Sequence, residues 1–161
     1  MNKKLCKAIN DQIKNEFYSA YLYLSMAAYF ESINLGGFAH WMRKQAKEEQ
    51  GHAMKIFDFL RDRGVVVILQ AIPEPPNSFS SPKQVFEETL KHEQKVTELI
   101  DKLYALSNQG GDNASAVFLQ WFITEQVEEE KNATTILEQL KIIKPDSPAL
   151  FMLDRALAQR Q

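Results

Sequence analysis

The feature that most constrains this chain is a proline-rich segment near its middle. Residues 65–83, VVVILQAIPEPPNSFSSPK, contain four prolines. Proline inside a helix removes a backbone hydrogen bond and clashes with the preceding turn, so this segment cannot be helical throughout. On both sides of it, apolar residues recur every three or four positions, which predicts long amphipathic helices. The sequence therefore predicts two helical halves joined by one long crossover.

Each half is predicted to form two long helices that pack antiparallel across a short connection. We expect these helices over residues 3 to about 33, 37 to 64, 82 to about 108 and 113 to about 143. Gly36-Gly37 and Gly110-Gly111 provide the breaks, and Ser81-Pro82 is typical of a helix start. A short fifth helix is expected over 149–158, after a break bracketed by Pro145 and Pro148. The predicted fold is an all-α four-helix bundle, with residues 1–161 forming one domain.

Composition narrows the classes of partner. The formal net charge is -2, from 19 basic and 21 acidic residues, so no strong positive field is available for nucleic acid or an anionic membrane. The longest aliphatic run, residues 65–69, is far shorter than the roughly 20 residues that span a bilayer. Cys6 is the only cysteine and cannot form an internal disulfide. These features favour a cytoplasmic protein that binds neither nucleic acid nor membrane.

One polar residue interrupts the apolar stripe of each long helix. In the segment KEEQGHAMKIFDFL, residues 47–60, helical rotation of about 100° per residue places Glu49 on the same face as Met42 and Ile56. The other three helices repeat the pattern with Glu16, Glu93 and Gln126. Each predicted helix therefore points a polar side chain inward near its middle.

The spacing of these residues indicates a faint internal duplication. Glu16 and Glu49 are 33 positions apart, and so are Glu93 and Gln126. An offset of 77 relates the two halves and aligns Glu-Glu-x-x-His at 48–52 with Glu-Gln-x-x-Glu at 125–129. Because the motif positions are three residues apart, each pair of side chains lies on one helix face.

Burying several like charges requires compensation. Each buried carboxylate costs several kcal/mol, and mutual repulsion adds to that cost, so cations are expected between the helices. Four carboxylates, from Glu16, Glu49, Glu93 and Glu129, would balance two divalent ions, with His52 as a neutral nitrogen ligand. Oxygen ligands with one imidazole suit Fe(II), Mn(II) or Zn(II). Glu49, beside His52, is the expected bridge in a dinuclear centre open to O₂ or peroxide.

Two other interpretations remain open from the residues. A single carboxylate or histidine on an apolar stripe is more often a hydrogen-bonded structural residue than a ligand, so the chain could be a metal-free helical interaction module. It could also be a di-iron oxidase or peroxidase that acts on a small substrate and stores no iron. The recurrence of the pattern in all four helices favours a metal centre over the metal-free module.

Several motifs of the chain resemble those of the non-haem ferritins of bacteria and archaea. They are YLYLSM, AHWMRKQAKEExxHAMK, LKHE and FLQWFITEQVEEE. The resemblance extends over essentially the whole chain and implies a ferritin-like bundle with a long crossover between the second and third helices. It also implies an iron-storing ferroxidase that uses O₂ or H₂O₂ and assembles into a 24-subunit shell in the cytoplasm.

The resemblance assigns roles to individual positions. The first iron position would be formed by Glu16, Glu49 and His52. The second would be formed by Glu49 as bridge, Glu93 and Glu129, with Gln126 beside them. A third, outlying iron position would be formed by Glu48, Glu125, Glu128 and Glu129. A tyrosine that hydrogen-bonds the centre, and that is thought to donate an electron, corresponds to Tyr23.

Departures from related families refine the expectation. Bacterioferritin-like chains carry a haem-ligating methionine next to the bridging glutamate, where this chain has Gln50, so no haem is expected. Gly51 interrupts a helix at a cost of about 1 kcal/mol relative to alanine, and either eases close packing near the centre or has no role. Several aromatic residues are expected to face outward and to be covered by other subunits, although some of them must belong to the core, namely Tyr29, Phe30, Trp41, Phe57 and Phe79.

Overall fold

The chain forms five helices and, within the parts described, no strands. The computed structural model describes residues 1–144 and 147–161. The helices are α1 (Lys3–Ser32), α2 (Gly36–Asp62), α3 (Pro82–Gln109), α4 (Asn113–Ile142) and α5 (Ala149–Leu157). The all-α prediction is confirmed, with helix ends within about two residues of those expected. The expected break at Pro145 lies outside the described residues.

Local chemistry explains where the helices begin and end. The Ser81 hydroxyl accepts a hydrogen bond from the Gln84 backbone N–H at 3.1 Å, and Pro82 occupies the first turn of α3. The Asp112 carboxylate caps α4 in the same way through the Ser115 N–H, at 3.0 Å. Gly64, with φ of 70°, adopts the left-handed conformation that ends the C-terminal turn of α2. These signals are local, which is why the sequence predicted them.

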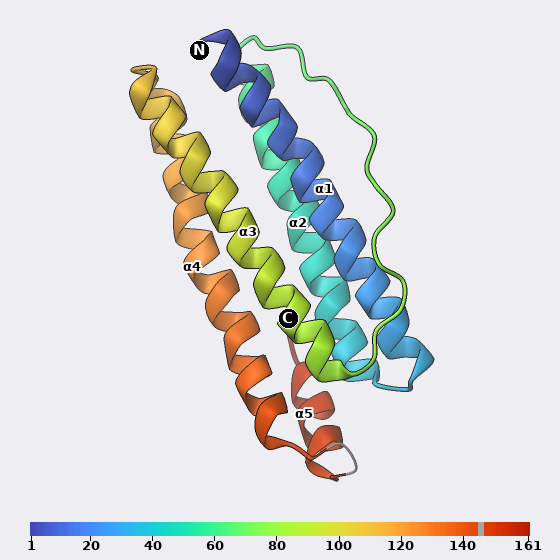
Figure 1. Ribbon diagram of the computed structural model, residues 1–161. Coiled ribbons are helices and arrows are strands. Elements are labelled where there is room, and N and C mark those ends of the chain that lie inside the picture. Colours follow the sequence, from blue (N-terminus) through green and yellow to red (C-terminus); the bar gives the residue numbers. More distant parts are fainter. Residues whose placement is uncertain (145–146) are drawn as a thin grey trace.

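The crossover runs along the outside of the bundle for nearly its whole length (Figure 1). α1 and α2 are antiparallel, the crossover returns the chain to the other end, and α3 and α4 form a second antiparallel pair (Figure 1). Asn10 fixes the crossover to α1, because its side chain bonds both the N–H and the C=O of Ile68, at 2.9 and 2.8 Å. Ser25 adds a bond of 2.6 Å to the Pro76 carbonyl.

Two apolar clusters fill the bundle, one towards each end. The cluster near the start of α1 includes Leu5, Ile9, Ile56, Leu60 and Phe122. The cluster near α5 includes Phe30, Phe38, Trp41, Phe86 and Leu157. Between them, a layer of polar side chains is at most 6% exposed, comprising Gln12, Glu16, Ser19, Gln45, Glu49, His52, Glu93, Gln126 and Glu129. The polar layer therefore separates the apolar core of the bundle into two parts.

α5 packs closely against the start of α2. A side chain on Gly37 would place its Cβ 1.6 Å from the Asp154 carbonyl oxygen, so only glycine permits this approach. The Asp154 carboxylate also accepts a bond of 2.9 Å from the Phe38 N–H. Leu153 and Leu157 complete the contact by joining the nearby apolar cluster.

The prediction of outward-facing aromatics is wrong for two residues. Phe30 is fully buried because its ring stacks on Phe38, with the ring centroids 4.9 Å apart. Trp41 is 6% exposed because it packs in the cluster that α5 joins through Leu153 and Leu157. Tyr29, Phe57 and Phe79 are partly buried against the two clusters. Among the residues described, no helix is both long enough and apolar enough to cross a membrane.

Candidate metal centre

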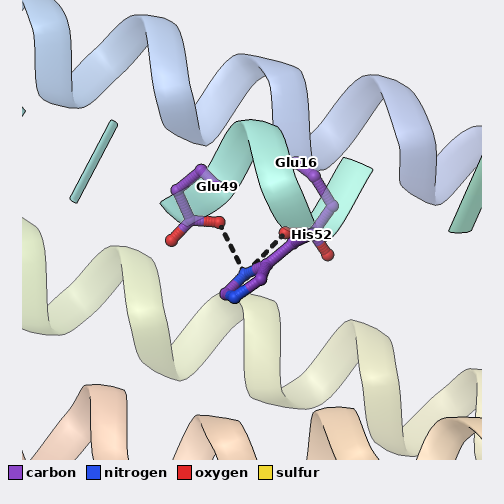
Figure 2. Close-up of side chains that lie close together, drawn as sticks. All are labelled: Glu16, Glu49 and His52. Atoms are coloured by element: carbon purple, nitrogen blue, oxygen red, sulfur yellow. Dashed lines mark ion pairs between the residues drawn. The ribbon is translucent and has the colours of Figure 1, made fainter. Parts of the chain in front are cut away.

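Glu16, Glu49 and His52 form a compact group in the polar layer (Figure 2). Glu16 comes from α1, while Glu49 and His52 lie on one face of α2, three positions apart. The His52 Nδ1 atom is 3.3 Å from a Glu49 carboxylate oxygen and 4.0 Å from a Glu16 oxygen. One ligand atom from each residue lies within 4.8 Å of the other two, which is close enough to share one metal ion.

The opposite wall of the layer presents Glu93 of α3. Gln126 of α4 donates from its amide to a Glu93 carboxylate oxygen at 3.1 Å and to the Glu93 backbone carbonyl at 3.2 Å. The Tyr23 hydroxyl, from α1, donates to the other carboxylate oxygen. Glu93 is therefore oriented by donors from two different helices. Gln126 and Tyr23, both predicted as site residues, contact this carboxylate directly.

The carboxylates of this layer are hard to ionise without a cation. Burial, and then the neighbouring Glu49 carboxylate, raise the pKa of Glu16 well above its usual value. Burial, and then Glu93 and Glu129, raise the pKa of Glu49 in the same way. Burial also raises the pKa of Glu93, although the bonds from Tyr23 and Gln126 oppose this. The pKa of Glu129 rises to about 7, mainly through burial.

The charges of the layer match a pair of divalent ions. Within residues 1–144 and 147–161, none of the four carboxylates forms an ion pair with a lysine or arginine. Two divalent cations would supply the missing positive charge, and the oxygen-rich ligands with one imidazole are typical of iron, manganese or zinc sites. Binding would release the protons that the raised pKa values retain.

Two glutamines of the layer were missed from the sequence. The Gln12 amide donates to a Glu16 oxygen at 2.8 Å. The Gln45 amide donates to Glu129 at 2.6 Å and lies 3.5 Å from Glu49. Gln12 and Gln45 are themselves 33 positions apart, each one turn before a glutamate. The spacing that relates Glu16 to Glu49 could therefore have found them.

The four residues of the predicted third iron position lie in different surroundings. Glu125 and Glu129 of α4 approach His52, and one ligand atom from each of the three lies within 4.8 Å of the others. Glu48 instead forms an ion pair with Arg160, at 2.5 Å. Glu128 is exposed on the outside of α4. The third position remains a prediction, with two of its four residues beside the centre.

Comparisons with known proteins agree with this geometry. A family model described as a ferritin-like domain matches residues 6–143. A bacterial non-heme ferritin from Staphylococcus saprophyticus is 42% identical over 99% of this chain and 96% of that protein. A bacterial non-heme ferritin from Bacteroides fragilis is 40% identical over 99% of both. An open-pore ferritin from the hyperthermophilic archaeon Archaeoglobus fulgidus, 50% identical, superposes with a TM-score of 0.99 over 100% of this chain and 99% of that one.

Proposed function

Because this chain belongs to the family of the bacterial non-haem ferritins, we propose that it oxidises Fe(II) to Fe(III) and stores the product as a ferric mineral. One observation carries the proposal. Carboxylates from all four long helices share one buried layer with an imidazole, and the described residues supply no lysine or arginine partner for them. Such a layer is stable in its ionised form only with metal cations bound.

Iron is the substrate of the proposed centre, and the residues divide into two positions. Glu16, Glu49 and His52 would hold the first Fe(II), as their mutual distances permit. Glu49 would bridge to a second Fe(II) held by Glu93 and Glu129. The two positions are shared between helices, so the fold itself sets the separation of the two ions. Glu48, Glu125 and Glu128 are proposed, with Glu129, to form an outlying third position.

The proposed reaction balances with two ions per turnover. Each Fe(II) gives up one electron, and O₂ with two protons accepts both electrons to form H₂O₂. With H₂O₂ as oxidant, the same two electrons and two protons give two molecules of water. Gln126 and Tyr23 hold Glu93 in place during this step through the hydrogen bonds they donate.

Storage requires an enclosed space, which a single chain does not provide. We propose that the chain assembles into the 24-subunit shell that its family membership implies, in the cytoplasm. Apolar side chains that are exposed on the single chain support assembly, because their contact with water is unfavourable. They include Tyr21 (50% exposed), Leu24 (48%), Phe151 (64%) and Met152 (72%).

The test is to add Fe(II) to the purified protein in air, follow ferric absorbance, and measure particle size and retained iron. A shell-sized particle that retains many irons per chain supports storage. Two irons per chain in a small oligomer would instead indicate an oxidase that stores no iron. Absence of both oxidation and binding would overturn the proposal and favour a metal-free helical module.

A further inference from the structure

The segment after α5 returns towards the middle of the bundle. α5 lies at one end of the bundle, whereas the chain end marked C lies back along the long helices (Figure 1). The His40 ring bonds the Arg160 backbone carbonyl at 2.7 Å, which fixes this segment against α2. Together with the contact of Asp154 at the start of α2, this places the Arg160 side chain beside the polar layer.

The Arg160 side chain makes four contacts, all with α2. One nitrogen of its guanidinium donates to the Gln45 side-chain oxygen at 2.9 Å and to the Trp41 backbone carbonyl at 3.3 Å. The other nitrogen donates to the Glu48 carboxylate at 2.5 Å. The guanidinium carbon lies 4.4 Å from the centre of the Trp41 ring. A planar fork held at several points is well ordered, and lysine could not reproduce its geometry.

The bond from Arg160 determines how the Gln45 amide is oriented. A glutamine side chain has one accepting oxygen and one donating nitrogen. Because Arg160 can only donate, the Gln45 oxygen faces Arg160 and the nitrogen faces the metal layer. There it donates to Glu129 at 2.6 Å. With the amide reversed, an oxygen would face the Glu129 carboxylate and repel it.

We propose that Arg160 is a positioning residue which acts through Gln45 to hold Glu129 ready for the second metal ion. The inference rests on the proposed function and extends it to a segment outside the four-helix bundle. Its effect is expected to be larger at the second position, since the Gln45 amide nitrogen is 2.6 Å from Glu129 but 3.5 Å from Glu49, the proposed bridge between both positions. Glu16 and His52 of the first position do not contact Gln45 among the hydrogen bonds of the described chain.

Zinc titration tests the proposal, because Zn(II) binds similar ligands and undergoes no redox reaction. Calorimetry on the wild-type protein should resolve two ions per chain. In Arg160→Gln the affinity for the second ion should fall roughly 10- to 100-fold, the usual cost of losing a residue that orients a ligand. The affinity for the first ion should stay within about threefold of wild type. The rate of Fe(II) oxidation should fall with the second affinity.

Two further variants separate positioning from general damage. Gln45→Leu, which removes the amide, should show the same loss, and the double variant Arg160→Gln/Gln45→Leu should be no worse than Gln45→Leu alone. Arg155→Gln removes the same charge from an exposed position of α5 and should bind both ions as the wild type does. Far-ultraviolet circular dichroism checks that every variant folds.

The outcomes are distinguishable from those of the proposed function. Three results would overturn the role of Arg160 and leave the ferroxidase proposal intact. They are an equal loss of affinity for both ions in Arg160→Gln, unchanged zinc binding in that variant, and additive losses of affinity in the double variant. A wild-type protein that binds no zinc in the polar layer would overturn both.

Discussion

The two halves of the bundle place polar residues at the same spacing but support them differently. In α1 and α2, each inward glutamate accepts a hydrogen bond, or has a close amide contact, from a glutamine one turn earlier on its own helix. The pairs are Gln12 with Glu16 and Gln45 with Glu49. This half also supplies His52, the only imidazole in contact with the layer's carboxylates among the ion pairs described. Its ligands are therefore positioned largely within α1 and α2.

Among the residues described, neither inward glutamate of the second half accepts a hydrogen bond from a donor on its own helix. Glu93 of α3 is held by Tyr23 from α1 and Gln126 from α4, and Glu129 of α4 is held by Gln45 from α2. Each of these donors comes from another helix. The proposed first position would therefore combine nitrogen with oxygen ligands that are supported within their own helices, while the proposed second position would have oxygen ligands held by donors from other helices. We expect the first position to bind Fe(II) or Zn(II) more tightly.

The largest effect is expected from Glu49, which we propose to bridge both positions. Glu49→Gln keeps the size of the side chain but removes the negative charge that would lie between the two ions. The rate of Fe(II) oxidation should fall roughly 1000-fold, which corresponds to about 4 kcal/mol in activation free energy. Stopped-flow measurement of ferric absorbance checks this, with size-exclusion chromatography to confirm assembly.

Glu48→Gln is the matched control for Glu49→Gln. Glu48 is the adjacent residue, its side chain is 43% exposed, and it pairs with Arg160 rather than facing the three-residue metal group. Its loss should slow oxidation far less than the loss of Glu49. If Glu49→Gln oxidised Fe(II) at the wild-type rate, Glu49 would not be a ligand of the site, and the difference inferred between the two halves would be wrong.

A second prediction concerns the pH dependence of stability in the metal-free protein. Folding raises the pKa of Glu129 from 4.5 to about 7, so the folded state binds more protons than the unfolded state between these values. The free energy of unfolding should therefore fall as pH rises through this range. Glu129→Gln removes this contribution, and it should stabilise the metal-free protein by about 3 kcal/mol at pH 8 and by less than about 1 kcal/mol at pH 5.

Urea denaturation at several pH values and one protein concentration measures this effect. Glu125→Gln provides the control, because Glu125 lies on the same helix and is less buried. A stability gain for Glu129→Gln that did not change with pH would show that Glu129 is not the group responsible. Saturating Zn(II) should reverse the trend, because the metal binds the deprotonated carboxylate.

Tyr23→Phe probes the dependence of the second half on donors from other helices. The substitution removes the hydroxyl that donates to Glu93 and leaves the ring. A hydrogen bond to a charged group contributes about 1.5 to 3 kcal/mol, so the affinity for the second ion should fall roughly 10- to 150-fold. Zinc calorimetry measures it.

Tyr18→Phe is a suitable comparison, since the Tyr18 ring packs 5.9 Å from His92 without a hydrogen bond to the layer. This variant should bind both ions like wild type. If Tyr23→Phe weakened the first ion more than the second, the assignment of Tyr23 to the second half would be wrong.

The sequence predicted features that depend on neighbouring residues. Ser81 and Asp112 cap helices within four residues of their partners, and helical periodicity alone placed Glu16, Glu49 and Glu93 on inward faces. These side chains lie in one layer because the two antiparallel helix pairs pack with the middles of their helices at the same height. A regular spacing within each half was sufficient to predict the layer.

Features created by long-range packing could not be predicted in this way. Trp41 was expected to face outward, but α5 and Arg160 cover it, and Arg160 is 119 positions away along the chain. The same arginine pairs with Glu48, which was expected to belong to an iron position. The sequence predicted the fifth helix itself, but helical periodicity contains no information about the face of α2 against which that helix packs.

The smallest effect expected is a change in stability at Gly51, where the two halves differ and no contact within the chain requires the difference. Gly51 of α2 corresponds, at an offset of 77, to Glu128 of α4, and both are exposed on the single chain. A Cβ on Gly51 would have no atom within 4 Å, so close packing within the chain does not require glycine. Gly51→Ala should therefore stabilise the chain by about 0.5 to 1 kcal/mol through lower entropy of the unfolded state.

Gly37→Ala, at another helical glycine of α2, is expected to destabilise the protein. There the new Cβ would lie 1.6 Å from the Asp154 carbonyl oxygen, so α5 must move and stability must fall. Urea denaturation of both variants measures whether each substitution raises or lowers the free energy of unfolding. If Gly51→Ala also destabilised the protein, and only in its assembled form, then another subunit approaches Gly51. The difference between the halves would then reflect assembly rather than chance.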